Sequence, residues 1–387
     1  MDKDADRETR AVRAGIDTDT QHGAVMPPVY LTSNFSFAGF GAPRAHDYTR
    51  TSNPTRDALA TALAELEGGA GATIAATGMV AITLALQLLD AGGKVVAPND
   101  CYGGTFRLFN GLAARGILDV VFVDQADHEA TAAALDGAGM LWVESPTNPL
   151  LRVMDLRKLR ELATARGALM VVDNTFLSPA LQRPLEFGVD LVVHSTTKYL
   201  NGHSDIVGGA VVVATDELAE RMAWWANALG LTGSPFDSFL TMRGIRTLYA
   251  RIAQHEKNAA ALASLLLEHD AVTRVHYPGL PADPGHALAC SQQDGFGGML
   301  SFELAGGKSA ARAFLESVRL FTLAESLGGV ESLACHPATM THATFDPESL
   351  AAAGITGGLV RLSVGIEATE DLARDVLGGL DAAVAAG

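Results

Sequence analysis

Seven short apolar runs recur along the first part of the chain, with starts roughly 20 to 30 residues apart. They span residues 72–75, 94–97, 119–123, 141–144, 169–173, 191–194 and 210–213. Their apolar residues are consecutive rather than alternate, which is typical of strands buried on both faces of a sheet. The spacing fits the strand, helix and connections of a βαβ unit. The repeat therefore predicts an open, mostly parallel sheet.

Helical patterns fill the gaps between these runs. In residues 56–69, Leu59, Leu63 and Leu66 fall on one stripe of a helix, and two glycines follow as a stop signal. Residues 155–167 repeat this arrangement, with leucines at 156, 159 and 162 and a glycine at the end. We therefore expect an α/β fold in which a mostly parallel seven-stranded sheet carries helices on both faces.

The repeat stops near Gly244. A long helical pattern, a proline-rich stretch at 276–286 and mixed strand and helix signals follow. We expect an extended N-terminal arm over residues 1–46, a large domain over 47–245 and a smaller C-terminal α+β domain over 246–387.

Composition narrows the functional classes. The 44 acidic and 28 basic residues give a formal net charge of −16, and such a surface repels the phosphates of nucleic acids. No apolar run approaches the roughly 18 residues of a membrane span. The charged start MDKDADRETRAVRAG lacks the apolar segment of a signal peptide, and three scattered cysteines argue against a disulfide framework. We expect a cytoplasmic protein that binds neither nucleic acid nor membrane.

Chemically versatile residues gather directly after the expected strands. These segments read ATGM at 76–79, NDCYGG at 99–104, ESPTNP at 144–149, DNT at 173–175 and HSTTKYLNG at 194–202. Open parallel sheets bind ligands outside the carboxyl ends of their strands. Together the segments supply one lysine, carboxylates, an aromatic ring, amides, hydroxyls and glycine N–H groups. They therefore predict a ligand site at this edge of the sheet.

Pyridoxal phosphate (PLP) is the cofactor that needs this set of groups. Its aldehyde needs an amine, for which Lys198 is the candidate, and its ring nitrogen needs a carboxylate, for which Asp173 is the candidate. Tyr102 is the candidate for stacking on the ring. Each residue alone is more often a surface, turn or packing residue. The combination at successive strand ends predicts a PLP enzyme.

The cofactor phosphate needs donors of its own. The segment TGMVAITLALQLL is expected to begin a helix at Gly78 and Met79, and the N–H groups of a helix N-terminus bind anions. Ser195 and Thr197 add hydroxyl donors from the strand end that carries the lysine.

Other catalytic and metal motifs are incomplete. STTK at 195–198 fits the S-x-x-K pattern of serine acylases, but the companion strings SDN and KTG do not occur. HEKNA at 255–259 is not the HExxH zinc motif, and the other histidines lack ligand spacing, so no metal site is expected. GFGGML at 295–300 lacks the third glycine of a dinucleotide fingerprint.

Taken together, the motifs resemble those of the Cys/Met-metabolism family of PLP enzymes, which has fold type I, the aspartate-aminotransferase-like fold. The resemblance runs from RAVRAGI at residues 10–16 to the final helix. It is carried by AHDYTRTSNPTRD, DCYGGTFRLF, VESPTNPLLRVMD, VVDNTFLSPALQ, HSTTKYLNGHSD, FTLAESLGGVESL and ATMTHA.

The resemblance implies a role for each matching residue. The catalytic residues would be Lys198, which forms the Schiff base and transfers protons, Asp173 on the ring nitrogen and Tyr102 over the ring. The remaining cofactor-binding residues would be Gly78, Met79, Thr175, Ser195 and Thr197, joined by Tyr48 and Arg50 of a neighbouring subunit. The substrate-binding residues would be Arg361, Asn148, Ser326, Arg107, Glu325 and Asp47.

The resemblance also implies an activity on small amino acids. The members that the chain resembles most form L-cystathionine from O-succinyl-L-homoserine and L-cysteine by γ-replacement, a step of transsulfuration in methionine biosynthesis. Arg107 and Arg50 favour this reaction, because either cation suits a leaving group with a distal carboxylate.

Three alternatives stay open. The nearest is a γ-lyase that cleaves L-cystathionine to cysteine, 2-oxobutanoate and ammonia, and the next is an O-acetylhomoserine sulfhydrylase. A catalytically silent oligomer that binds the cofactor is the alternative from another class. Because Tyr48 and Arg50 would serve a neighbouring subunit, the resemblance implies a homotetramer, a dimer of dimers with shared active sites to which the N-terminal arm contributes.

Overall fold

The computed structural model describes residues 5–387 and contains two compact units. The first unit runs to Asp90 and resumes over Val171–Tyr249, and the second comprises Ala91–Met170 and Ala250–Gly387. The domain boundaries expected at residues 46 and 245 stay predictions. The first four residues of the expected arm lie outside the described part of the chain.

All seven expected strands are present, and each has both ends within one residue of its expected bounds. They are β1 (Gly71–Ala75), β2 (Lys94–Pro98), β3 (Asp119–Val123), β4 (Met140–Glu144), β5 (Leu169–Asp173), β6 (Leu191–His194) and β7 (Gly209–Val213). Their order in the sheet is β1-β7-β6-β5-β4-β2-β3. β7 is antiparallel to β1 and β6, whereas the pairs β5–β6, β2–β4 and β2–β3 are parallel. The predicted α/β class with a mostly parallel seven-stranded sheet is confirmed.

The helices of the first unit begin and end at capping residues. α2 (Pro54–Glu67) follows Asn53, whose side chain accepts an N–H of the first turn, and ends at Gly68 with φ 77°. α3 (Gly78–Leu86) follows Thr77, whose hydroxyl caps it in the same way. Both helices pack on β1 and β7. The other helices of this unit are α1 (Arg7–Val12), α7 (Ser178–Leu181), the 3-10 helix η1 (Pro184–Phe187), α8 (Asp216–Leu229) and α9 (Pro235–Ile245).

The second unit contains a smaller sheet in the order β10-β11-β12-β9-β8. Its strands are β8 (Val272–His276), β9 (Met299–Leu304), β10 (Thr322–Leu323), β11 (Leu333–Cys335) and β12 (Leu359–Ser363). Phe302 of β9 and Phe314 of α12 (Gly307–Ser317) are fully buried, and their rings meet edge to face with centroids 5.2 Å apart. Such aromatic pairs stabilise a core beyond the area they bury. The expected smaller α+β part is therefore present with its own core.

The second unit also holds the helices that flank its strands. These are α4 (Gly103–Ala113), α5 (His128–Ala134), α6 (Leu156–Arg166), α11 (His286–Gln292), α12 (Gly307–Ser317), the 3-10 helix η2 (Pro337–Thr339), α13 (Pro347–Ala353) and α14 (Thr369–Ala386). α10 (Leu248–Leu267) contains the chain boundary between the units. α6 lies between the cap residues Asp155 and Gly167, as its leucine pattern predicts.

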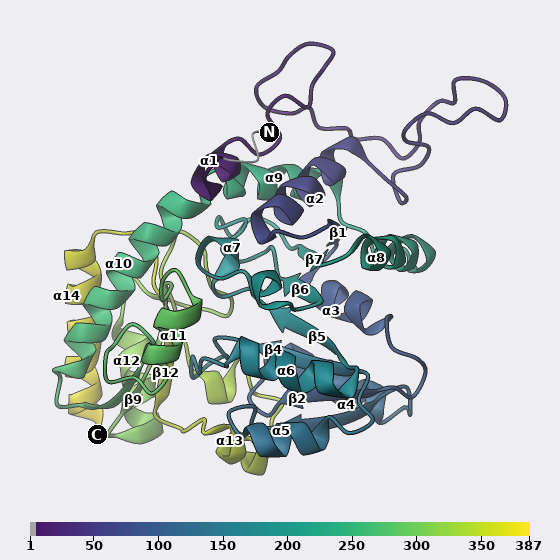
Figure 1. Cartoon of the computed structure of the whole chain (residues 1–387). Coiled ribbons are helices and arrows are strands. Elements are labelled where there is room, and N and C mark those ends of the chain that lie inside the picture. Colours follow the sequence, from purple (N-terminus) through teal and green to yellow (C-terminus); the bar gives the residue numbers. More distant parts are fainter. Residues whose placement is uncertain (1–4) are drawn as a thin grey trace. The chain divides into compact units, whose positions relative to one another are not determined.

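The chain between α1 and α2 is an arm with little regular structure. Isolated bridges, Asn34 with Tyr48 and Gly39 with Ala42, are its ordered pairings, and Figure 1 shows it as two long loops drawn in purple. Several of its large apolar side chains are exposed, among them Leu31 at 71% and Phe40, which is fully exposed. The arm thus presents apolar surface that the single chain does not cover.

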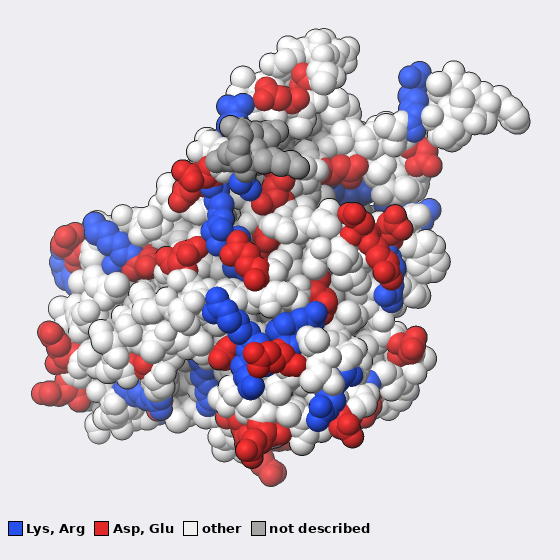
Figure 2. All heavy atoms as spheres, in the orientation of Figure 1, with Lys and Arg blue, Asp and Glu red and all other residues white. Residues whose placement is uncertain are grey.

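Charge is mixed on the face of the molecule drawn in Figure 2. Acidic and basic side chains alternate there, and among the residues described the lysines and arginines of this face form no broad patch of their own. Within residues 5–387, none of the helices has the length and the apolar character that crossing a membrane requires.

Candidate active site

Three strand ends of the first unit meet at Ser195. Its N–H donates to Thr175 Oγ1 over 2.9 Å, which joins the ends of β6 and β5. A β-carbon at Gly78, the first residue of α3, would lie 2.8 Å from the Ser195 Cβ. The start of α3 therefore approaches Ser195 closely only because residue 78 is glycine. The structure brings together three residues expected to bind the cofactor, of which Gly78 and Ser195 are expected at its phosphate.

The remaining expected phosphate residues belong to the same loops. Met79 is the second residue of α3. Thr197 is fixed by Gly208, because its hydroxyl accepts the Gly208 N–H over 3.0 Å and also bonds to the Gly208 carbonyl. A helix N-terminus beside a serine suits a phosphate, because the N–H groups of its first turn point toward the anion, so the residues present fit the cofactor predicted from the sequence.

Asp173 ends β5 and accepts the Thr175 N–H at Oδ1 over 3.0 Å. Burial raises the pKa of its carboxyl group above the ordinary value, and this effect outweighs the hydrogen bonds from Thr175 and the charge of His194, both of which lower the pKa. A positively charged ring nitrogen at this carboxylate would oppose the effect of burial. Asp173 is therefore a buried carboxyl group whose ionised form would be stabilised by a cationic partner such as a pyridinium.

Lys198 lies in a tight turn after β6. Its N–H donates to the Ser195 carbonyl over 3.2 Å, and its own carbonyl accepts the Gly202 N–H over 2.7 Å. α9 supports this turn from outside, because a β-carbon at Gly244 would collide with the backbone oxygen of Asn201. The half-buried lysine is thus held by backbone bonds and by close packing of α9.

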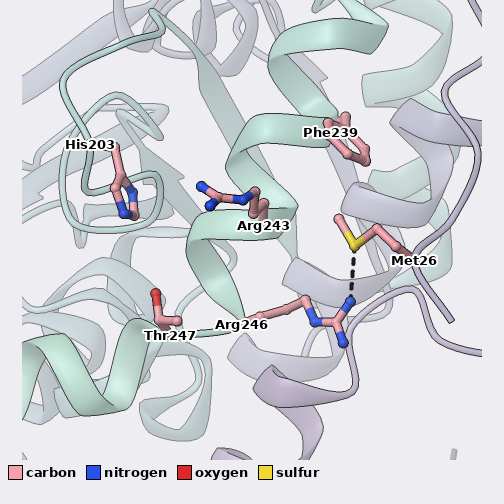
Figure 3. Close-up of a pocket in the computed structure, with 6 residues that line it drawn as sticks. All are labelled: Met26, His203, Phe239, Arg243, Arg246 and Thr247. Atoms are coloured by element: carbon pink, nitrogen blue, oxygen red, sulfur yellow. Dashed lines mark hydrogen bonds between the residues drawn. The ribbon is translucent and has the colours of Figure 1, made fainter.

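A cavity of about 430 Å³ adjoins the far end of the lysine turn. In Figure 3 the side chain of Arg243 extends from α9 on the side of His203, and Arg246 extends to Met26, whose sulfur accepts from Nη1 over 3.0 Å. The His203 ring bonds through Nδ1 to the Asn201 carbonyl over 2.7 Å. Phe239 and Thr247 complete the lining. Nothing in the sequence pattern indicated this cavity.

Tyr48, Arg50 and Asp47 lie on the arm or directly after it. Arg50 donates from Nη1 to the carbonyl and side-chain oxygens of Asn227 on α8, over 2.8 and 2.9 Å, and its guanidinium lies 5.6 Å from the ring centre of Tyr48. The Tyr48 ring is exposed, and its N–H donates to Asp47 Oδ1 over 2.6 Å. That Tyr48 and Arg50 bind the cofactor of a neighbouring subunit stays a prediction.

In the second unit a buried arginine is presented by β12. Arg361 is 3% exposed, and it donates from Nη1 to Asn148 Oδ1 and from Nη2 to the Ser326 carbonyl, each over 2.9 Å. Its Nε has no hydrogen-bond partner among residues 5–387. A buried guanidinium with an unused N–H is suited to an anion, above all a carboxylate. Three of the expected substrate-binding residues therefore lie together.

Tyr102 stands at the start of α4 in the same unit. Its N–H donates to both oxygens of the Glu144 carboxylate, over 2.9 and 3.1 Å. Burial and then the charge of Glu325 raise the pKa of its phenol, and Arg107 and Arg361 act in the opposite direction. Glu325 and Arg107, both expected at the substrate, are thus close enough to Tyr102 to act on its charge.

Glu144 and His342 are two residues of this cluster that the sequence reasoning did not single out. His342 is fully buried, and its Nδ1 lies 2.9 Å from the hydroxyl oxygen of Thr341. Burial, reinforced by the charge of Arg361, lowers the pKa of His342 to about 4, so the ring is neutral at neutral pH. For Glu144 a signal was present, since it is a carboxylate at a strand end. For His342 the motif ATMTHA was the signal.

Known proteins with related sequences agree with these observations. The family described as Cys/Met metabolism PLP-dependent enzyme matches residues 8–381. The cystathionine gamma-synthase of Escherichia coli K12 is 54% identical over 377 residues, which cover 97% of this chain and 98% of the relative. The cystathionine beta-lyase of Coxiella burnetii is 46% identical and covers 95% of this chain and 96% of its own length.

A solved structure gives the same result. The cystathionine gamma synthase of Xanthomonas oryzae pv. oryzae, in complex with cystathionine, superimposes with a TM-score of 0.97 at 58% identity, over 99% of this chain and all of the other. The chain therefore belongs to the Cys/Met-metabolism family of PLP-dependent enzymes. Its cofactor is pyridoxal 5′-phosphate, and cystathionine metabolism is the chemistry of its relatives.

Proposed function

We propose that the protein forms L-cystathionine from O-succinyl-L-homoserine and L-cysteine by γ-replacement. The observation that carries this proposal is the buried guanidinium of Arg361, held by Asn148 and Ser326 with one N–H unused. It suits the α-carboxylate of an amino-acid substrate. The relatives named cystathionine gamma-synthase from Escherichia coli and Xanthomonas oryzae support the choice of reaction.

The residues of the first unit serve the cofactor in this proposal. Lys198 attaches it, Asp173 holds its ring nitrogen, and Gly78, Met79, Thr175, Ser195 and Thr197 bind it together with Tyr48 and Arg50 of a neighbouring subunit. The start of α3 beside Ser195 supports the phosphate assignment, because helix N–H groups attract anions. When bound, the cofactor withdraws electrons from the substrate and makes the hydrogens on its α- and β-carbons acidic.

The residues of the second unit serve the substrate. Arg361 orients the α-carboxylate, and Tyr102 covers the ring. Arg107 binds the distal carboxylate of the succinyl group, since a guanidinium pairs with a carboxylate through two hydrogen bonds. Glu325 receives the amino group of the incoming cysteine, assisted by Asp47.

Lys198 is also the base and acid of the reaction. With the cofactor bound to the substrate amine, the free Lys198 amine would take the proton from Cα and would give it up to the cofactor before it takes the proton from Cβ, because one amine carries one extra proton at a time. The Cγ–O bond then breaks and succinate leaves as a carboxylate. The sulfur of cysteine forms the new bond to Cγ, and its thiol proton is released. Lys198 finally returns protons to Cβ and Cα.

We also propose that the active form is a cytoplasmic homotetramer with shared sites. The exposed apolar side chains of the arm, Leu31, Phe37 and Phe40, support this assembly, because such surface marks interaction sites. Light scattering of the purified protein tests the mass.

The deciding experiment offers the purified protein O-succinylhomoserine with and without cysteine, and L-cystathionine alone. We expect the highest kcat/KM with the first pair, with cystathionine and succinate as products. Faster release of 2-oxobutanoate from cystathionine would favour a γ-lyase, and pyruvate would favour a β-lyase, the activity named for the Coxiella relative. Loss of the visible cofactor absorbance in Lys198→Ala, with wild-type folding, tests the attachment and separates an enzyme from a silent binder.

A further inference from the structure

A carboxylate and an imidazole are buried together behind the cofactor-binding residues of the first unit. Glu67 is the last residue of α2, His194 is the last residue of β6, and neither has any exposed surface. Oε1 of Glu67 lies 2.6 Å from Nε2 of His194. Ionisable groups are rarely buried unless they are paired, and the mechanism proposed above does not use this pair.

The geometry indicates an ion pair rather than two neutral groups. The N···O distance of 2.6 Å is shorter than an ordinary N–H···O bond, as a charge-assisted bond is. Glu67 Oε1 also accepts from Asn174 Nδ2 over 3.0 Å, as a carboxylate does. Glu67 Oε2 and His194 Nδ1 have no hydrogen-bond partner among residues 5–387. Because both atoms are buried and no further hydrogen bond from the described residues stabilises them, each charge of the pair depends on the other.

The pair is connected to two strand ends that carry cofactor-binding residues. Asn174 follows Asp173, and His194 precedes Ser195. Asp173 and Val193 are partners in the parallel pair β5–β6, so the next residues, Asn174 and His194, share the opposite face, where Glu67 bonds to both. Glu67 thus links α2 to the residue after Asp173 and to the residue before Ser195.

Asn174 is held on its other side as well. Its Nδ2 donates to the Gln182 carbonyl over 2.7 Å, and its Oδ1 accepts from Gln182 Nε2 over 3.1 Å. With the N–H and the oxygen of its side-chain amide both bonded to Gln182, Asn174 is fixed, and it in turn holds Glu67 Oε1 in place. The position of the imidazole therefore depends on Glu67.

The pair also affects the pKa values of two nearby groups, Asp173 and Tyr249. The His194 charge lowers the pKa of the Asp173 carboxyl against the effect of burial. Glu67 acts on Tyr249, where burial is the main cause that raises the phenol pKa to about 12. Tyr249 therefore stays neutral at ordinary pH, and Asp173 is the ionising group that responds to His194.

We propose that Glu67 and His194 are positioning residues of the cofactor site: their contact fixes the ends of β5 and β6 and so the places of Asp173 and Ser195. A purely structural role explains less, because a buried ion pair stabilises a fold no better than apolar residues of the same volume. The inference rests on PLP binding through Lys198 and is independent of which substrate is converted.

The test compares holoenzymes of the wild type, Glu67→Gln and His194→Gln. Each variant keeps a hydrogen-bonding side chain of similar size and removes one charge. Glu65→Gln is the matched control, because Glu65 lies on the same helix and is exposed. The readouts are the rate of cofactor loss on dilution, the pH midpoint of the visible absorbance of the bound cofactor, and the thermal midpoint.

We expect both charge variants to bind the cofactor roughly tenfold more weakly, and the pH midpoint to rise by about one unit, the size of a tenfold change in a protonation equilibrium. The pH midpoint should rise because a less positive ring nitrogen withdraws fewer electrons from the bond to Lys198, so that this bond keeps its proton up to a higher pH. Glu65→Gln should match the wild type in all three readouts.

Lower thermal midpoints with unchanged cofactor loss and unchanged pH midpoint would overturn the proposal. Failure of both variants to fold would overturn it too, since the pair would then serve core stability. Absence of a lysine-bound cofactor in the wild type would instead refute the proposed function.

Discussion

Replacement of Arg361 by lysine is the sharpest test of the substrate site. A guanidinium has five N–H donors, and two of these are already used by Asn148 and Ser326 at 2.9 Å each. Three donors remain for a carboxylate, which allows a paired contact. A lysine has three donors, and after the same two bonds only one remains. Arg361→Lys therefore keeps the charge and loses one charge-assisted hydrogen bond to the substrate.

The magnitude follows from that single bond. Hydrogen bonds to charged groups contribute about 1.5–3 kcal/mol, and 1.4 kcal/mol corresponds to a tenfold change. We expect kcat/KM for O-succinylhomoserine at saturating cysteine to fall by about 10- to 150-fold, while the visible absorbance of the bound cofactor stays at the wild-type level. Arg312→Lys is the control, because Arg312 is an exposed arginine of α12 paired with Glu316. A kcat/KM within threefold of the wild type in Arg361→Lys would refute the carboxylate assignment.

Three further predictions concern the framework of the sites. Because burial lowers the pKa of His342 from 6.5 to about 4, the unfolded chain binds the proton first, and stability falls as pH drops through this interval. His342→Gln should reduce that fall by about 3 kcal/mol in urea unfolding, and identical pH slopes would contradict this. Gly244→Ala should lower the free energy of unfolding by about 1–3 kcal/mol, because the new β-carbon would collide with the lysine turn. Gly111→Ala is the control, since Gly111 is exposed on α4 and a β-carbon there would meet no atom within 4 Å. In the same thermal scan it should raise stability by up to about 1 kcal/mol. Glu144→Gln should cost about 1 kcal/mol, because it removes a charge that accepts the Tyr102 N–H at the start of α4, and it should lower kcat; unaltered kinetics would separate Glu144 from catalysis.

The large sheet could be predicted from the sequence because its signals are local. Each strand is a consecutive apolar run with turn residues on both sides, and each intervening helix carries its own stop, such as Gly68 after α2 or Gly167 after α6. The strand ends then indicated where Asp173, Ser195 and Lys198 would lie, since parallel strands expose their carboxyl ends at a common edge.

The smaller sheet could not be outlined in the same way. β10 and β11 have two and three residues, too few for a periodic pattern. Arg361 shows the difficulty, because an arginine in a strand sequence usually faces water. Here it lies on β12, which has β11 and β9 as neighbours, and it is buried.

Buried partners from distant parts of the chain also escaped sequence reasoning. Glu67 and His194 are 127 residues apart, and each fits its local element without a partner, one as a helix end and the other as a strand end. Only the folded chain, in which the end of α2 meets the end of β6 through these two side chains, reveals that they form a pair.

The pairing of β1 with β7 has a consequence for biosynthesis. β1 forms an edge of the large sheet, and among residues 5–387 its sole neighbour there is β7, whose Gly209 pairs with Ala75 from 134 residues earlier. At translation rates of about 5–20 residues per second, the first strand emerges roughly 7 to 27 s before its neighbour. During that interval β1 lacks the strand that pairs with it in the folded protein, so ribosome-bound chaperones have a defined target, and truncation anywhere before residue 209 leaves β1 without that strand.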